Sequence, residues 1–273
     1  MLSRPASDTQ ITHGHRLWLY VLGGLICFFL VVPSLIVIPM SFSGTKFLQF
    51  PPESWSTQWY EVYFNSVEWR EATIVSAKAA VLTTLLATPA GTMAAYGIHV
   101  SRTRLSGVLR LVMVMPLMIP VILIAIGVFF LYARIGLNNT IPGLVLAHSV
   151  LAVPFVVVTV TAGLKSFDMN QEMVARSLGA SRLRAFFSVT LPQIRFSVLS
   201  GALFAFITSL DEVVIALFIA RGDGSTLTRR MFAFLRDQVD PTIAAISTLL
   251  IGVSIVMLLL YAILGQLDAR RRG

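Results

Sequence analysis

Six long apolar runs, separated by shorter polar segments, make up most of this chain of 273 residues. Each run is long enough to cross about 30 Å of hydrocarbon as an α-helix, which rises about 1.5 Å per residue. The pattern therefore predicts an all-α membrane protein with six transmembrane helices. The predicted helices are Leu17–Met40, Ala72–Ile98, Val108–Tyr132, Ile141–Leu164, Phe196–Ala220 and Ile243–Leu264.

One polar and basic stretch, residues 168–194, lies between the fourth and fifth of these runs. Asp168, followed three residues later by Gln171, predicts a capping box at the start of a short helix. Gly179 predicts the end of that helix, because glycine readily adopts the left-handed conformation found at helix C-termini. A helix, a glycine turn and a second helix form a compact projection suited to a groove in a soluble partner. We call residues 168–194 the knob.

The second short helix of the knob is predicted to begin after Ser181, whose hydroxyl can cap it, and to end at Pro192. Its apolar side chains recur at three- and four-residue spacing, which is typical of an amphipathic helix. The apolar face is expected to consist of Leu183, Phe186, Phe187 and Val189, whereas Arg182 and Arg184 stay in water.

Composition and charge support a membrane protein with several spans. Hydrophobic residues make up 56% of the chain and charged residues 12%, and the mean hydropathy is +0.81. The formal net charge is +8, but the basic residues cluster at the ends of the apolar runs, where they set membrane topology. We therefore expect these basic residues to lie at the surface of a lipid membrane and not to bind nucleic acid.

Six crossings place both termini on the same side of the membrane. The segments on that side hold 13 of the 21 lysines and arginines, and the opposite segments hold seven, with Lys78 inside a span. Because cytoplasmic loops are enriched in basic residues, both termini and the knob are predicted to be cytoplasmic. The predicted organisation is a cytoplasmic segment 1–16, a six-helix domain 17–264 and a basic cytoplasmic tail 265–273, with a cytoplasmic loop 165–195 and outer segments 41–71, 133–140 and 221–242.

Two adjacent acids, Asp211 and Glu212, fall inside the fifth predicted helix. An ionised carboxylate there costs at least about 2.5 kcal/mol unless it is paired or hydrated. Neighbouring side chains point about 100° apart around a helix, so we expect Asp211 to line a translocation path and Glu212 to form a structural ion pair, although the roles could be exchanged. The alternative is that Lys78 or Arg221 neutralises both acids. The predicted substrate path consists of Ser209, Asp211, Glu212 and Lys78.

The outer segment 41–71 is rich in aromatic residues, which predicts an interfacial aromatic belt. The alternative is that it helps to form a surface on which an external binding protein docks. The segment 221–242 carries charges of both signs, which suit a reversible contact, and is the other candidate for that surface. The aromatic residues are Trp55, Trp59, Tyr60, Tyr63, Phe64 and Trp69.

The remaining chemistry-bearing residues do not predict a metal or nucleotide site. The single cysteine, Cys27, has no partner for a disulfide or a cysteine metal site, and no G-x-x-x-x-G-K-[ST] loop is present to bind ATP. His148 is expected to hydrogen-bond a backbone carbonyl rather than a metal. The other histidines, His13, His15 and His99, are scattered.

The knob resembles the EAA loop of the membrane subunits of binding-protein-dependent ABC importers. That motif reads Glu-Ala-Ala, three residues, Gly, nine residues, a branched apolar residue, any residue, Leu-Pro. The chain departs from it at Met173, which stands where the motif has Glu, and at Val174, which stands where it has the first Ala, while Glu172 lies one position earlier. The matching positions are Ala175, Gly179, Val189, Leu191 and Pro192.

In such importers the EAA loop contains the coupling helix that contacts the ATPase, so the resemblance implies this role for the knob. If the motif acid contacts the ATPase in relatives, that contact is here either lost or made by Glu172 from a neighbouring angle. The implied coupling residues are Glu172, Met173, Ala175, Gly179, Ala180, Ser181, Leu191 and Pro192.

Two further stretches, residues 122–164 and 202–220, resemble the permeases of polyamine-type ABC importers, the group of the spermidine and putrescine systems. The resemblance implies a type I ABC importer permease fold in the bacterial inner membrane, with a polyamine or related cationic amine as the substrate. It also implies a second permease subunit, expected to be a different chain, a periplasmic substrate-binding protein and two copies of a cytoplasmic ABC ATPase that bind ATP and Mg.

With the ATP chemistry in those partners, no catalytic residue and no cofactor are expected in this chain. Some permeases of related systems carry amino-acid-derived compounds or phosphonates, so these stay open as alternative substrates. From the residues alone, an ion-coupled secondary transporter working through the two adjacent acids is a further alternative, as is a membrane scaffold.

Overall fold

The computed structural model describes residues 16–101, 103, 105–237 and 241–272. Within these ranges the chain is mainly helical, and its only β-type pairing is an isolated bridge between Ser43 and Trp55. The predicted all-α fold is therefore confirmed. Most of the predicted segment 1–16 lies outside the described residues, and so do Arg102, Arg104 and Asp240.

Five helical runs among the described residues are long and apolar enough to cross a membrane, and there are six if one bent pair of helices is counted as a single span. The first predicted span agrees with the structure at both ends, whereas the last continues as a helix through the predicted basic tail. The runs are α1 (Leu17–Met40), α3 (Val67–Val100), α6 (Ile141–Ser166), the stretch Arg182–Asp211 that includes α9 (Leu191–Asp211), and α12 (Thr242–Arg272).

The third predicted span, residues 108–132, is broken and is not one continuous helix. The chain instead forms α4 (Ser106–Val114), a short 3-10 turn and α5 (Val121–Ile135), with a bend of 93° between the two halves. Pro116 and Pro120 lie at this bend. Each proline lacks the N–H that would continue the helical hydrogen bonds, and its ring clashes with the preceding turn.

The chain divides into two compact units, of which the first comprises residues 1–65 and 239–252. In this unit the indole N–H of Trp59, in α2 (Gln58–Asn65), donates to the carbonyl of Ser43 over 2.7 Å. Trp59 and Tyr63 are buried, whereas Trp55 is exposed. Part of the predicted aromatic belt is thus the interior of this unit.

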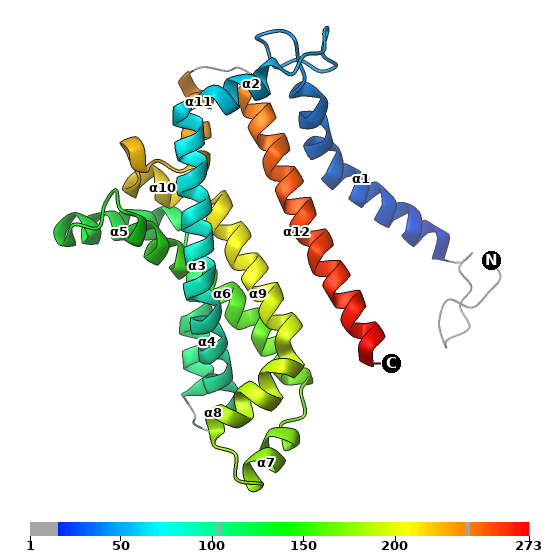
Figure 1. Ribbon diagram of the computed structural model, residues 1–273, viewed down its shortest axis with the longest axis vertical. Helices are drawn as coiled ribbons and strands as arrows, with labels where there is room; N and C mark the ends of the chain where they lie inside the picture. Colours follow the sequence, from blue (N-terminus) through cyan, green and yellow to red (C-terminus); the bar gives the residue numbers. More distant parts are fainter. Residues whose placement is uncertain (1–15, 102, 104, 238–240, 273) are drawn as a thin grey trace. The chain divides into compact units, whose positions relative to one another are not determined.

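The second unit comprises residues 66–238 and 253–273, and its centre is a bundle of α3, α6 and α9, which lie side by side (Figure 1). Close approach of the helices depends on glycine. A Cβ atom added at Gly91 of α3 would meet the side chain of Val156 at 2.7 Å, and one at Gly201 of α9 would meet the backbone of the same residue at 3.1 Å. Small residues at such positions let membrane helices pack tightly.

A second group of helices packs on one end of this bundle. It consists of α5, α10 (Val214–Ile219) and α11 (Leu227–Asp237), and Ile215 and Ile219 of α10 are fully buried in a cluster with Tyr132 and Leu144. The prediction that the fifth span reaches Ala220 was wrong, because α9 ends at Asp211 and α10 is a separate helix.

Candidate functional site

The first half of the knob contains the short helix α7 (Asn170–Ser177), followed by a glycine turn. Asp168 does not form the predicted capping box, since the N-cap is Met169 and the Asp168 carboxylate accepts the N–H of Asn170 over 3.0 Å. Gly179 has a φ of +94°, which confirms the predicted turn. Residues with side chains rarely adopt this conformation.

The second half of the knob begins with Ser181, whose hydroxyl accepts the N–H of Arg184 over 3.3 Å, as predicted. The helix does not end at Pro192: α8 (Arg182–Ala185) passes through a π-helical turn (Phe186–Thr190) directly into α9. Pro192 lies in the first turn of α9. In a regular helix its ring would clash with the carbonyl four residues earlier, but that carbonyl belongs to the wider π turn.

The π turn also changes which side chains of the knob are buried. Of the predicted apolar face, Phe186 is buried with Thr190, whereas Leu183 and Phe187 are exposed. The π turn begins at Phe186 and inserts extra backbone into the helix, so the side chains from there on are rotated from the positions that regular helical spacing predicts. Leu183 precedes the turn, which therefore does not account for its exposure.

Glu172 is only 2% exposed and is held by two hydroxyl groups from other parts of the chain. Its Oε1 accepts the hydroxyl of Tyr96, in α3, over 2.6 Å, and its Oε2 accepts the hydroxyl of Thr190, in the π turn, over 2.5 Å. The ring of Tyr96 also packs on Phe186, with centroids 4.6 Å apart. We call Tyr96, Glu172 and Thr190 the clasp.

The other predicted coupling residues lie mainly on the outside of the knob. Met173 is 48% exposed. Leu178, next to the glycine turn, was not among the predicted coupling residues and is 84% exposed. The structure therefore turns Met173 outward and Glu172 inward, as expected for neighbours on a helix. Of the remaining positions, Gly179, Ser181 and Pro192 are exposed, and Ala175, Ala180 and Leu191 are half-buried.

Glu212 lies at the junction between α9 and α10, where its side chain caps α10. Its carboxylate oxygens accept the N–H groups of Ile215 over 2.8 Å and of Ala216 over 3.1 Å. Among the described residues it forms no ion pair with Lys78 or Arg221, which contradicts the alternative in which these two residues neutralise both acids. The free N–H groups at the start of α10 supply the partial positive charge instead.

His148, in α6, meets Glu212 and Ser209 in the interior. Its Nδ1 is 2.8 Å from the Ser209 hydroxyl, and its Nε2 is 3.7 Å from a carboxylate oxygen of Glu212. His148 therefore bonds a side chain and not the backbone carbonyl that we expected. We call His148, Ser209 and Glu212 the polar node. All three are buried, so a hydrolytic use of this serine, histidine and acid would require access that the structure does not provide.

Asp211 is exposed, unlike Glu212, and no hydrogen bond or ion pair to it is found in the described part of the chain. The structure thus separates the two acids, but not through the predicted 100° spacing, because α9 ends at Asp211 and Glu212 has an extended backbone. No group of histidine, cysteine or acidic residues within the described ranges could hold a metal ion.

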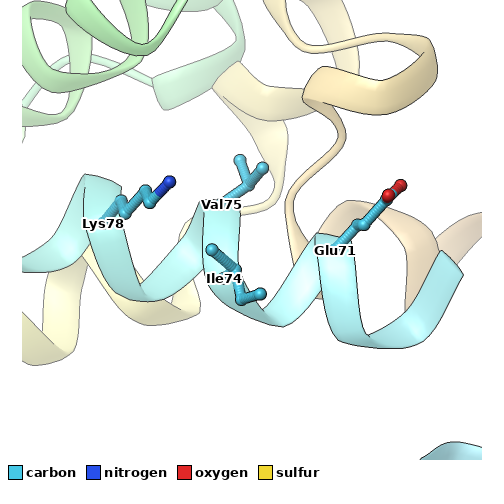
Figure 2. A pocket seen from close by; sticks show the side chains of 4 residues that line it. All are labelled: Glu71, Ile74, Val75 and Lys78. Atoms are coloured by element: carbon cyan, nitrogen blue, oxygen red, sulfur yellow. The ribbon is translucent and has the colours of Figure 1, made fainter. Parts of the chain in front are cut away.

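Lys78 lines an open cavity of about 440 Å³ beside α3, together with Glu71, Ile74 and Val75. Glu71 and Lys78 point to the same side of the helix (Figure 2). Sequence reasoning missed Glu71, although its spacing of seven residues from Lys78, about two helical turns, places both on one face.

Sequence reasoning also missed Tyr96 and Thr190. Neither residue has a distinctive spacing from Glu172, because the three belong to different elements and meet only in the folded chain.

Comparison with known proteins identifies the family to which the chain is similar. Residues 87–272 match the model of the family described as binding-protein-dependent transport system inner membrane component. The spermidine/putrescine transport system permease protein PotC of Haemophilus influenzae is 31% identical over 250 residues, covering 90% of this chain and 93% of the relative. The putrescine transport system permease protein PotI of Escherichia coli (strain K12) is 30% identical over 251 residues and 89% of each chain.

The fold is also similar to that of a solved transporter. A chain of a bacterial alginate ABC transporter, solved in complex with an alginate pentasaccharide-bound periplasmic protein, has a TM-score of 0.68 over 93% of this chain and 94% of the other. The two sequences share 15% identity, so the likeness supports the type I permease fold predicted above.

Proposed function

The chain belongs to the family of inner-membrane components of binding-protein-dependent transport systems, and from this premise we propose that it carries a polyamine or a related cationic amine. It is a multi-pass inner-membrane permease subunit of an ABC importer. An ion-coupled secondary transporter is not favoured, because members of this family work with a binding protein.

The exposed carboxylate of Asp211 is the observation that carries the proposed substrate class. It ends a membrane-spanning helix and has no cation within hydrogen-bonding distance in the described part of the chain. An acid at membrane depth is costly unless it faces water, protein or a cationic ligand. Glu71 adds a second carboxylate, beside the cavity of Lys78. The sequence relatives named for spermidine and putrescine support a cationic ligand.

The coupling role of the knob rests on its exposed apolar residues. Leu178 and Met173 are exposed on the knob, and so are Arg176, Arg182 and Arg184 of the same loop. Apolar side chains within a basic rim suit a groove of a soluble protein that carries acidic residues. We assign this groove to a cytoplasmic ABC ATPase, and we propose that the knob and both chain termini are cytoplasmic.

The assembly that follows has four core subunits. This chain pairs with a second, different permease chain, and two ATPase copies bind the knobs and hold ATP and Mg. A periplasmic binding protein delivers the substrate. Hydrolysis of ATP belongs to the ATPase copies, and this chain supplies the path and the coupling contact.

The test is ATP hydrolysis by the reconstituted complex with its binding protein, measured against putrescine, spermidine, a neutral amino acid and a phosphonate. Only the polyamines should stimulate the wild type. Asp211→Asn should need at least about tenfold more polyamine for half-maximal stimulation, a change of about 1.4 kcal/mol. Asp237→Asn is the matched control, because this exposed acid of α11 already contacts Arg236.

Two outcomes would contradict parts of the proposal. Stimulation by the amino acid or the phosphonate, equal in wild type and Asp211→Asn, would leave an importer with another substrate. An equal loss in Asp211→Asn and Asp237→Asn would show a general effect of surface charge and remove Asp211 from the path.

A further inference from the structure

Glu172 occupies an unusual position for a residue of a docking loop, because its carboxylate is buried beneath the knob. Only 2% of the residue is exposed, whereas its neighbour Met173 is 48% exposed. A partner protein that approaches the outside of the knob meets Met173 first. It could reach Glu172 only by displacing the two hydroxyls that the carboxylate already binds.

The clasp connects three elements that are distant in the sequence. Glu172 belongs to α7, Tyr96 lies near the end of α3, and Thr190 lies in the π turn that leads into α9. The contact between the rings of Tyr96 and Phe186 joins α3 to the π turn a second time. The docking helix is thereby bound to two membrane-spanning helices at once.

Because Glu172 is buried, both of its hydrogen bonds must be kept when the knob moves. A carboxylate removed from water needs a donor for each oxygen, and here each oxygen has one hydroxyl donor. A movement of α7 away from either membrane helix would leave a buried charge with an unsatisfied oxygen. Movement of the three elements together keeps both bonds intact.

We propose that Glu172 is a positioning residue for ATP coupling, which transmits movement of the knob to α3 and α9 and makes no contact with the ATPase. Its place in the sequence, one position before the acid of the EAA motif, agrees with this inward direction. The inference rests on the proposed function, in which the knob docks on an ATPase. The clasp then acts as the joint between the docking surface and the membrane helices.

The experiment compares the clasp with the outer surface of the knob in the full reconstituted complex. Glu172→Gln keeps the size of the side chain but replaces one acceptor oxygen with an NH₂ group. Tyr96→Phe and Thr190→Val each remove one donor. Leu178→Asp is the matched control, because it alters an exposed position of the same loop. The measurements are co-purification of the ATPase subunit and the amount of putrescine taken up per ATP hydrolysed.

Glu172→Gln should retain the ATPase subunit at the wild-type level while uptake per ATP falls at least about fivefold, the lower range of energetic coupling between sites. Tyr96→Phe and Thr190→Val should each give a smaller fall, and adding either to Glu172→Gln should change little, because the three groups act as one unit. Leu178→Asp should instead lose the ATPase subunit.

Wild-type uptake per ATP in Glu172→Gln would overturn the inference, and so would loss of the ATPase subunit from that variant. If Glu172→Gln does not accumulate in the membrane, the milder Tyr96→Phe decides: an unchanged ratio contradicts the clasp. Failure of the wild type to co-purify with any ATPase would contradict the proposed function instead, so the two failures are distinguishable.

Discussion

Two buried glutamates flank the same membrane-spanning run, Arg182–Asp211, and they are held in different ways. Glu172, before the run, receives hydroxyl groups from residues 76 and 18 positions away. Glu212, after the run, receives main-chain N–H groups only three and four positions away. The first glutamate therefore fixes how separate elements are arranged, and the second fixes where one short helix begins.

Because the two glutamates have different partners, we expect substitutions at the two ends of the run to have different effects. Loosening Glu172 frees the knob from the membrane helices but leaves each helix intact. Loosening Glu212 unwinds the start of α10 and opens the polar node, next to the exposed Asp211. We therefore expect changes at the knob end to reduce coupling more than stability, and changes at the junction to reduce stability.

The largest effect is expected from Gly179→Val at the knob end. The positive φ of Gly179 is strained for a β-branched residue, by about 1–3 kcal/mol, although a Cβ would meet no atom within 4 Å. The turn should therefore change shape, and uptake should fall more than about tenfold, or 1.4 kcal/mol. Uptake and the amount of protein in the membrane are the measurements.

The control for this variant is Gly265→Val, since Gly265 of α12 also has open space around it but a helical backbone. It should transport normally. Equal loss in both variants would show that valine itself, and not the turn, is responsible.

A smaller effect, on stability, is expected from Glu212→Gln at the junction. The glutamine side chain retains one acceptor, so one of the two N–H groups at the start of α10 loses its partner, at about 1–3 kcal/mol. Unfolding in detergent, followed by denaturant titration, should show this loss. Asp211→Asn should leave unfolding within about 0.5 kcal/mol, because exposed positions tolerate change. Equal destabilisation by the two variants would remove the distinction between these adjacent acids.

The sequence predicted the fold better than it predicted these contacts. Hydrophobic periodicity and length located the membrane helices, and Gly179 and Ser181 marked the turn and the second cap, because these signals are local. The break at Pro116 and Pro120 was visible as two prolines, but its 93° bend depends on how the two halves pack.

The clasp and the polar node could not be predicted, because they depend on tertiary contacts. Nothing in the spacing of Tyr96, Glu172 and Thr190 shows that they meet. The cap formed by Glu212 was missed for a related reason. Periodicity treated residues 196–220 as one helix, whereas the Glu212 side chain accepts main-chain N–H groups and caps a new helix.

A third prediction measures the polar node separately from the cap. Ser209→Ala leaves Nδ1 of His148 without its partner, which should lower the free energy of unfolding by about 1 kcal/mol. Ser188→Ala is the control, because that exposed hydroxyl bonds only a carbonyl of its own helical run. Identical unfolding curves for Ser209→Ala and the wild type would mean that the node contributes nothing and that the cap alone stabilises the junction.

The smallest effect on the free energy of unfolding is expected from Glu68→Gln, because this acid of the second unit is exposed. Glu68, at the start of α3, pairs with Arg230 of α11, whose guanidinium also lies 5.3 Å from the ring centre of Trp69. The side chain of Glu68 is 70% exposed, so solvent and salt screen the pair, and Glu68→Gln should cost under about 1 kcal/mol. Unfolding at low and high salt is the measurement, and the small difference should shrink further in high salt. A loss as large as that of Glu212→Gln, unchanged by salt, would show that burial is not what separates these acids.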